Sequence, residues 1–253
     1  MPIDLIYFTG GARERVLEAV LAAGHRVSEI FVNDPVRWPN VVPTLQIASC
    51  RGIKVTVITR KTDLLKHYDR LRGKQCLSAG YNYLFDDLFL ETVSWCINVH
   101  GSLLPNYPGA RTLGWIIEND EPRSGVTVHI VDRGVDTGAV VLQREFNVSP
   151  FETTRSLSNK TYSFEPQVVV EALSIIEQFG FTRTMPQSPN QTTHLNRVPS
   201  DGEVDTNLSL KQVFNKIRAA DPEKYPAYFY HHGEKVLINL WRPDKNSDEE
   251  DLI

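Results

Sequence analysis

An asparagine and a histidine two positions apart form the most informative pair in this sequence. Asn98 and His100 lie in INVHGSLLPNYPGAR, residues 97–111, and Asp136 follows in the glycine-flanked segment RGVDTG. An amide can donate to the oxyanion that develops at a carbonyl, an imidazole can take a proton near neutral pH, and a carboxylate can orient that imidazole. The three residue types therefore indicate acyl transfer to an amine. From spacing alone, a hydrogen-bonded Asn-x-His pair in the core is an equal alternative.

The elements that must position these residues alternate between β-rich runs and amphipathic stretches. Parallel strands are predicted at 3–8, 27–33, 53–58, 75–80 and 94–99. Residues 11–25 repeat apolar side chains at i,i+4, which predicts a crossover helix that Gly24 can end. This alternation is typical of a doubly wound α/β sheet, whose ligands bind at the carboxyl ends of its strands. Asn98 and His100 lie at such an end, on the same side of the strand.

The second half of the chain predicts two further strands, SGVTVHIVD and AVVLQREFNV, and a long helix over 152–179. Pro166 is expected to interrupt or kink that helix, and Gly180 to end it. We therefore divide the chain into a catalytic domain (1–180), a polar surface linker (181–205), a small C-terminal subdomain (206–245) and an acidic tail (246–253). The subdomain is expected to hold one amphipathic helix and a β-hairpin that turns at 232–234.

Composition excludes several classes of protein. The 253 residues include 27 Lys plus Arg and 31 Asp plus Glu, for a net charge of −4, and 41% are hydrophobic. This is the composition of an ordinary globular protein. No apolar run approaches the ~20 residues of a membrane span, and the N-terminus lacks the features of a signal peptide. We therefore predict a cytoplasmic protein with no membrane partner.

Metal, redox and nicotinamide chemistry are not indicated. Cys50, Cys76 and Cys96 are isolated in or beside apolar segments, so we interpret them as reduced core residues and predict no metal. Gly10 and Gly11 follow the first strand without a full G-x-G-x-x-G pattern. They are expected to shape a tight turn rather than to bind a dinucleotide.

The runs INVHGSLLPNYPGA and SGVTVHIVDRGVDTGAVV, with the spacing between them, resemble the folate-dependent formyltransferase family. The resemblance covers roughly residues 1–180, with a weaker match at IRAADPEKYPAYFY. It implies a Rossmann-like fold, 10-formyltetrahydrofolate as the formyl donor, no metal, and Asn98, His100 and Asp136 as the catalytic set. It also implies that backbone groups near Tyr83, Leu84 and Asp132 contact the pterin, although the tyrosines of GYNYLF can equally be core aromatics.

The acceptor is less clearly indicated. A tRNA-binding appendage should be basic, yet residues 182–253 hold nine Lys or Arg and eleven Asp or Glu, so no nucleic acid partner is expected. The resemblance favours the nucleotide-sugar N-formyltransferases, with a dTDP-4-amino-4,6-dideoxyhexose for O-antigen lipopolysaccharide as acceptor and a homodimer as the assembly. UDP- or GDP-amino sugars, glycinamide ribonucleotide, and a non-catalytic folate- or nucleotide-sugar-binding module remain alternatives. The candidates for acceptor binding are Arg111, Arg218, Lys224, and Tyr225 or Tyr228.

Overall fold

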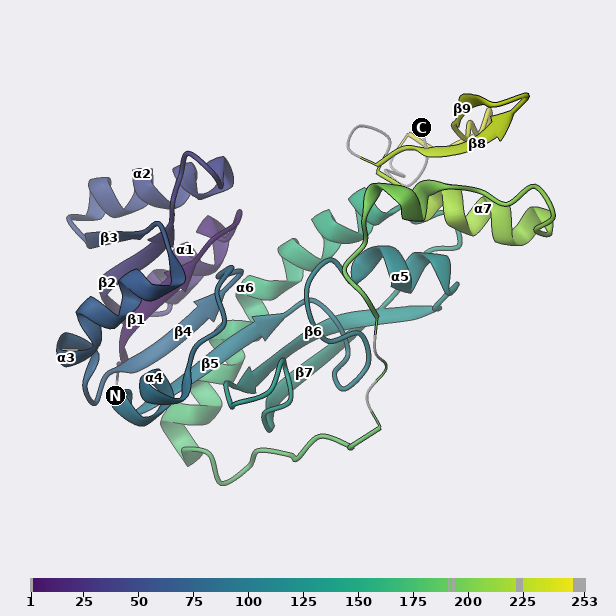
Figure 1. The fold of residues 1–253 in the computed structure, drawn as a ribbon. Helices are drawn as coiled ribbons and strands as arrows, with labels where there is room; N and C mark the ends of the chain where they lie inside the picture. Colours follow the sequence, from purple (N-terminus) through teal and green to yellow (C-terminus); the bar gives the residue numbers. More distant parts are fainter. Residues whose placement is uncertain (1, 191, 193, 222–224, 248–253) are drawn as a thin grey trace.

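The computed structural model describes residues 2–190, 192, 194–221 and 225–247, and within these ranges seven strands form one sheet of order β3-β2-β1-β4-β5-β6-β7 (Figure 1). The strands β1 to β5 pair in parallel, whereas β6 and β7 are antiparallel to their neighbours. The bounds are β1 Asp4–Thr9, β2 Arg26–Asn33, β3 Lys54–Ile58, β4 Gln75–Ala79, β5 Trp95–His100, β6 Arg123–Ile130 and β7 Val140–Asn147. The predicted mostly parallel, doubly wound sheet is confirmed, and each predicted strand lies within two residues of the observed one.

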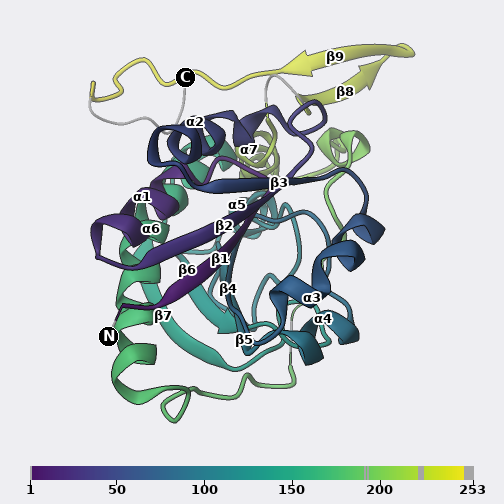
Figure 2. The same ribbon diagram turned by 90° about the vertical axis from the view of Figure 1, so that its left-hand side faces the viewer.

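Helices cover both faces of the sheet (Figure 2). One face carries α1, α2 and α6, which share a hydrophobic core with the strands, and the other carries η2, α3 and α4 over a second cluster. Their bounds are α1 Glu14–Ala22, η1 Pro39–Val41, α2 Val42–Arg51, η2 Lys61–His67, α3 Tyr68–Leu71, α4 Asp87–Thr92, α5 Leu113–Glu118 and α6 Thr154–Phe179. Within the described residues, no helix combines the length and the apolar character needed to cross a membrane.

Three local expectations about the core can be compared with the structure. Gly10 lies between β1 and α1 in a closely packed place, because a Cβ there would collide with Asn33 and Gly80. The predicted interruption at Pro166 is wrong, since α6 continues through it with Glu165 and Val168 buried on either side. Tertiary packing outweighs the lost backbone bond. Cys76 and Cys96 are buried as predicted, whereas Cys50 is exposed.

The C-terminal part packs directly on the sheet domain. Its elements are η3 Pro199–Gly202, α7 Leu210–Ala219, β8 Ala227–His231 and β9 Glu234–Ile238. The helix α7 lies against α5, and its last residue, Ala219, belongs to the main core. The hairpin β8-β9 projects beyond α7 (Figures 1 and 2) and turns at His232 and Gly233, both with positive φ, as a two-residue hairpin turn requires.

Candidate active site

A cleft of about 640 Å³ opens at the carboxyl ends of β1, β4 and β5. Its walls come from the segments that follow these strands and from the loop before α5. The lining includes Gly10–Arg13, Gly80–Leu84, Asn98–Gly101, Gly109–Gly114, and Val135 with Asp136. The sheet topology therefore places the cleft where an open α/β sheet binds ligands.

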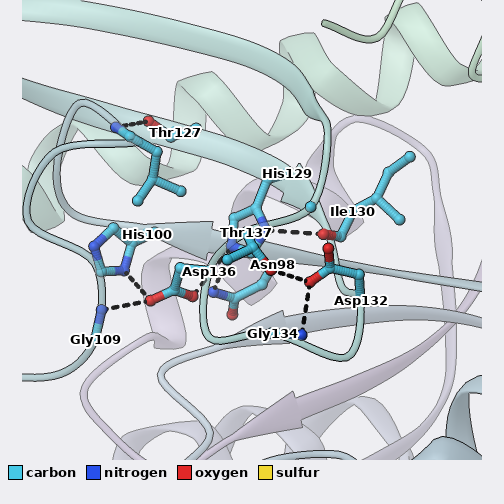
Figure 3. A network of polar contacts seen from close by, with 12 residues as sticks. Asn98, His100, Gly109, Thr127, His129, Ile130, Asp132, Gly134, Asp136 and Thr137 are labelled. Atoms are coloured by element: carbon cyan, nitrogen blue, oxygen red, sulfur yellow. Dashed lines mark hydrogen bonds and ion pairs between the residues drawn. The ribbon is translucent and has the colours of Figure 1, made fainter. Parts of the chain in front are cut away.

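The three residues of the predicted catalytic set converge in this cleft (Figure 3). The β6–β7 loop folds back toward β5, so that Asp136 Oδ2 lies 3.4 Å from His100 Nδ1. Asn98 belongs to the same group of side chains, with its Nδ2 3.3 Å from Nε2 of His129. An amide, an imidazole and a carboxylate thus share one wall of the cleft, as acyl transfer requires.

Both ring nitrogens of His100 face oxygen acceptors. Nε2 lies 2.8 Å from the Tyr107 carbonyl, which can only accept a hydrogen bond, and Nδ1 faces the Asp136 carboxylate. Only the imidazolium has a proton for each contact. The surroundings of His100 therefore suit a cation that faces developing negative charge.

Asp136 is held as a carboxylate. Burial by itself would raise the pKa of its carboxyl, but the attraction of His100, the hydrogen bond and charge of His129, and the Gly109 N–H at 2.8 Å hold that pKa well below its usual range. Its backbone has φ of 54°, in the left-handed region. Asp136 therefore keeps a fixed negative charge between two imidazoles (Figure 3).

His129 is a member of the site that the sequence did not reveal. Its Nδ1 lies 2.9 Å from the Ile130 carbonyl, and its Nε2 lies 3.3 Å from Asp136 Oδ1. From the sequence, His129 is simply one position of a predicted buried strand. Its polar side chain within the apolar run VTVHIV is the one feature that could have indicated a functional role. The antiparallel register, which pairs Asn98 with His129, brings the two side chains together.

An ion pair closes the base of the cleft between its β1 side and α6. Arg13 Nε lies 2.6 Å from Oε2 of the fully buried Glu165, and the Arg13 guanidinium stacks on Tyr162. Burial raises the pKa of Glu165 to about 7, although Arg13 lowers it. The pair fixes the turn after β1 against the long helix.

Of the three residues predicted to contact the pterin, two belong to the cleft lining. Tyr83 and Leu84 line the cleft, and the Tyr83 hydroxyl donates to the Thr59 carbonyl at 2.8 Å. Asp132 is not among the described residues that line the cleft. Its Oδ1 accepts from the Gly134 N–H and the Thr137 hydroxyl, so its carboxylate shapes the loop that presents Asp136.

The candidates for acceptor binding fall into three groups. Arg111 and Tyr225 both line the cleft, and Arg111 Nη1 donates to the Tyr225 hydroxyl at 3.4 Å. Lys224 lies outside the described residues. Arg218 and Tyr228 are buried and are not among the described residues that line the cleft, so no contact in the structure supports their predicted role in acceptor binding. Tyr228 packs under Lys235.

Arg218 has a structural role instead. Its guanidinium, in a residue that is 2% exposed, donates to the Glu152 carbonyl, to Asn215 and to Asp120. The helical pattern of α7 marks Arg218 as a surface cation, but the packing of α7 on α5 encloses it. Asp120 also pairs with the exposed Lys211.

Arg218→Met should therefore destabilise the protein without changing catalysis. We expect a loss of about 2–3 kcal/mol in the free energy of unfolding, because a buried carbonyl and amide lose a charged donor. Urea unfolding measures this loss. Lys211→Met, which removes an exposed partner of the same carboxylate, should cost less than about 0.5 kcal/mol. Equal effects of the two substitutions would contradict the structural role.

Within the part of the chain that the structure describes, no group of three or more His, Cys, Asp or Glu side chains is arranged to hold a metal ion. Residues 47–173 match the family model described as formyl transferase. Methionyl-tRNA formyltransferase from Alkaliphilus oremlandii is 27% identical over 235 residues, which cover 89% of this chain and 74% of that protein.

Two solved structures share the fold. A 4-N formyltransferase from Francisella tularensis superposes with a TM-score of 0.74 at 22% identity, covering 94% of this chain and 97% of the other. WlaRD, a sugar 3N-formyl transferase solved in the presence of dTDP and 5-N-formyl-THF, gives 0.67 at 20% identity, covering 87% and 79%.

Proposed function

This chain belongs to the formyl transferase family, and on that premise we propose that it moves a formyl group from 10-formyltetrahydrofolate to the primary amine of a nucleotide-linked amino sugar. The observation that carries the proposal is the convergence of Asn98, His100 and Asp136 in one cleft. The specific acceptor we propose is a dTDP-4-amino-4,6-dideoxyhexose, of the kind used for the O-antigen of lipopolysaccharide.

The reaction follows from the charges of the site. The neutral amine attacks the formyl carbon, and the carbonyl electron pair moves onto the oxygen. The Asn98 amide donates to this oxyanion, and the His100 imidazolium stabilises it by its charge. The amine proton leaves through a water beside the Asp136 carboxylate. When the tetrahedral centre collapses, the carbon–nitrogen bond to N10 of the folate breaks, and N10 takes up a proton.

The donor would lie between two loops that line the cleft. Tyr83 and Leu84 come from one loop and Val135 from the other, and Leu84 and Val135 are 62% and 45% exposed. Exposed apolar side chains at the rim of a cleft suit a flat aromatic ligand. Asp132 would act by holding the second loop in shape.

A sugar nucleotide fits the acceptor side better than a tRNA does. The cation Arg111 and the aromatic Tyr225 share one wall, which suits a diphosphate beside a nucleobase. Nine Lys or Arg against eleven Asp or Glu in residues 182–253 give a balance of −2, which does not favour a polyanion. The identity to methionyl-tRNA formyltransferases keeps methionyl-tRNA as the competing acceptor.

One assay separates these acceptors. The protein is incubated with 10-formyltetrahydrofolate and, in parallel, with dTDP-, UDP- and GDP-linked amino sugars, glycinamide ribonucleotide and methionyl-tRNA, and products are read by mass spectrometry. We expect formylation of a dTDP-4-amino sugar. Product from methionyl-tRNA alone would refute the sugar proposal, and binding of folate and nucleotide sugar without any product would indicate a non-catalytic module. Light scattering tests the proposed homodimer.

Arg111→Ala should weaken acceptor binding selectively. Loss of a charge-assisted contact to a diphosphate is expected to raise KM for the acceptor about 10- to 100-fold, with little change in kcat or in KM for the folate. Steady-state kinetics with each substrate varied in turn measure this. The control is Arg123→Ala, an exposed arginine that is paired with Glu145 and is not among the described residues of the cleft lining. An unchanged acceptor KM in Arg111→Ala would exclude the contact.

A further inference from the structure

Residues 184–190, 192 and 194–198, here called the connecting segment, contact the β6–β7 loop that carries Asp136 and the loop after β5 that contains Tyr107. The segment belongs to the part of the chain between α6 and α7 (Figure 1). Near its start, Met185 exchanges two backbone hydrogen bonds with Val140 at the beginning of β7. A polar stretch without periodicity is thus attached to the edge of the sheet rather than passing freely over the surface.

The amide of Gln187 reaches from this segment to the backbone of the Asp136 loop. Its Nε2 donates to the Asp136 carbonyl at 2.8 Å and to the Gly138 carbonyl at 2.7 Å. Gly138 is itself confined, because a Cβ there would collide with the Ile130 carbonyl. The two hydrogen bonds flank Thr137, and the first of them holds the carbonyl of Asp136 itself. The carboxylate of Asp136 faces His100 and His129 (Figure 3).

Asp136 needs such support. A left-handed φ is unfavourable for a residue with a side chain and persists only where surrounding contacts impose it. The Gly109 N–H holds the carboxylate, and Gln187 holds the backbone on either side of Thr137. Burying the Gln187 Oε1 atom with no hydrogen-bond partner among the described residues is unfavourable. This unfavourable burial is offset by the two hydrogen bonds that the Gln187 amide donates to the Asp136 loop.

The same segment supports the partner of His100. Tyr107 donates its N–H to the Thr192 hydroxyl at 2.8 Å, and its carbonyl accepts from His100 Nε2. The His194 ring stacks between Tyr107 and Trp115. The connecting segment therefore contacts both the loop that carries Asp136 and the loop whose Tyr107 carbonyl binds His100.

We propose that Gln187 is a positioning residue for formyl transfer, which acts by fixing the backbone of Asp136 so that its carboxylate meets His100. The inference rests on the proposed function. Gln187 is not among the described residues that line the cleft. Its loss should therefore displace a catalytic group without removing a substrate contact.

Gln187→Ala is expected to lower kcat about 10- to 100-fold with KM for both substrates changed less than about 2-fold, as a small misplacement of a catalytic group does. In an Asp136→Asn background the same substitution should have almost no further effect, because the group it positions is already disabled. Asn190→Ala, an exposed amide in the same segment, is the matched control and should leave kcat unchanged. An unchanged kcat in Gln187→Ala, or full additivity with Asp136→Asn, would overturn the inference.

A second readout does not depend on the acceptor. NMR of the imidazole nitrogens and protons, assigned with His100→Ala, should show the His100 and His129 signals shifted in Gln187→Ala and unshifted in Asn190→Ala. Unshifted signals in Gln187→Ala would refute the positioning role even if no acceptor in the panel were formylated. If only the proposed function is wrong, the wild-type protein will formylate no amine in the panel, but Gln187→Ala will still shift the His100 and His129 signals.

Discussion

Asp136→Asn should lower kcat by about 10³- to 10⁴-fold while the protein stays folded. The substitution keeps the shape of the side chain but removes the charge that favours the His100 imidazolium, and an aspartate that orients a catalytic histidine is worth about this much when made neutral. The amide NH₂ would also face a ring nitrogen that needs an acceptor. Single-turnover kinetics with saturating donor and acceptor measure the chemical step.

Asp69→Asn, at a carboxylate with a fully exposed side chain, is the control and should be neutral. The same pair of variants tests the charge of Asp136 through stability. Its pKa is lower in the folded than in the unfolded protein, so it stabilises the fold above the unfolded pKa of about 4. That stability is lost as the pH falls toward the folded pKa. Unfolding free energy should thus depend less on pH below about 5 in Asp136→Asn; an unchanged slope would contradict the assignment.

His100→Ala should have an effect of similar size, about 10³- to 10⁴-fold on kcat. It removes the cation beside the oxyanion and leaves the half-buried Asp136 carboxylate with His129 as its remaining imidazole neighbour among the described residues. Folate affinity, measured by titration calorimetry, should change little, because the proposed pterin contacts lie in the loops around Tyr83 and Val135.

The control for His100→Ala is His231→Ala in the hairpin, outside the cleft lining. Undiminished turnover in His100→Ala would eliminate its proposed role. In the double variant His100→Ala with Asp136→Asn, the fold-decrease in kcat should be far smaller than the product of the two single fold-decreases, because the two residues act as one unit. Multiplicative losses would mean that the two side chains act independently.

Several features of the fold could be predicted because they depend on local rules. The runs at 27–33 and 94–99 form strands, as expected of short segments rich in β-branched and aromatic residues between turn signals. The pair Asn98 and His100 faces one cleft because strand side chains alternate. The path of α6 through Pro166 could not be predicted, since it depends on the core that covers both halves of the helix.

Some residues of the candidate site could likewise be predicted from the sequence, and others could not. Asn98, His100 and Asp136 were found from residue type and motif, whereas His129 required the β5–β6 register and Gln187 required the path of the connecting segment. Arg218 looked like a surface cation and is buried. Charge and helical period say which face of a helix is polar, but they do not say what packs on it.

By itself, then, the sequence determined the doubly wound sheet, the strand that carries the amide and the imidazole, and the chemistry that these groups can perform. Only the tertiary structure decided that Asp136 lies between two histidines and that Arg111 meets Tyr225. It also decided that a segment expected to be a surface linker is bound to the Asp136 loop. Alternation and helical period are properties of neighbouring residues, whereas these contacts join positions many residues apart. Their formation depends on the packing of the whole core.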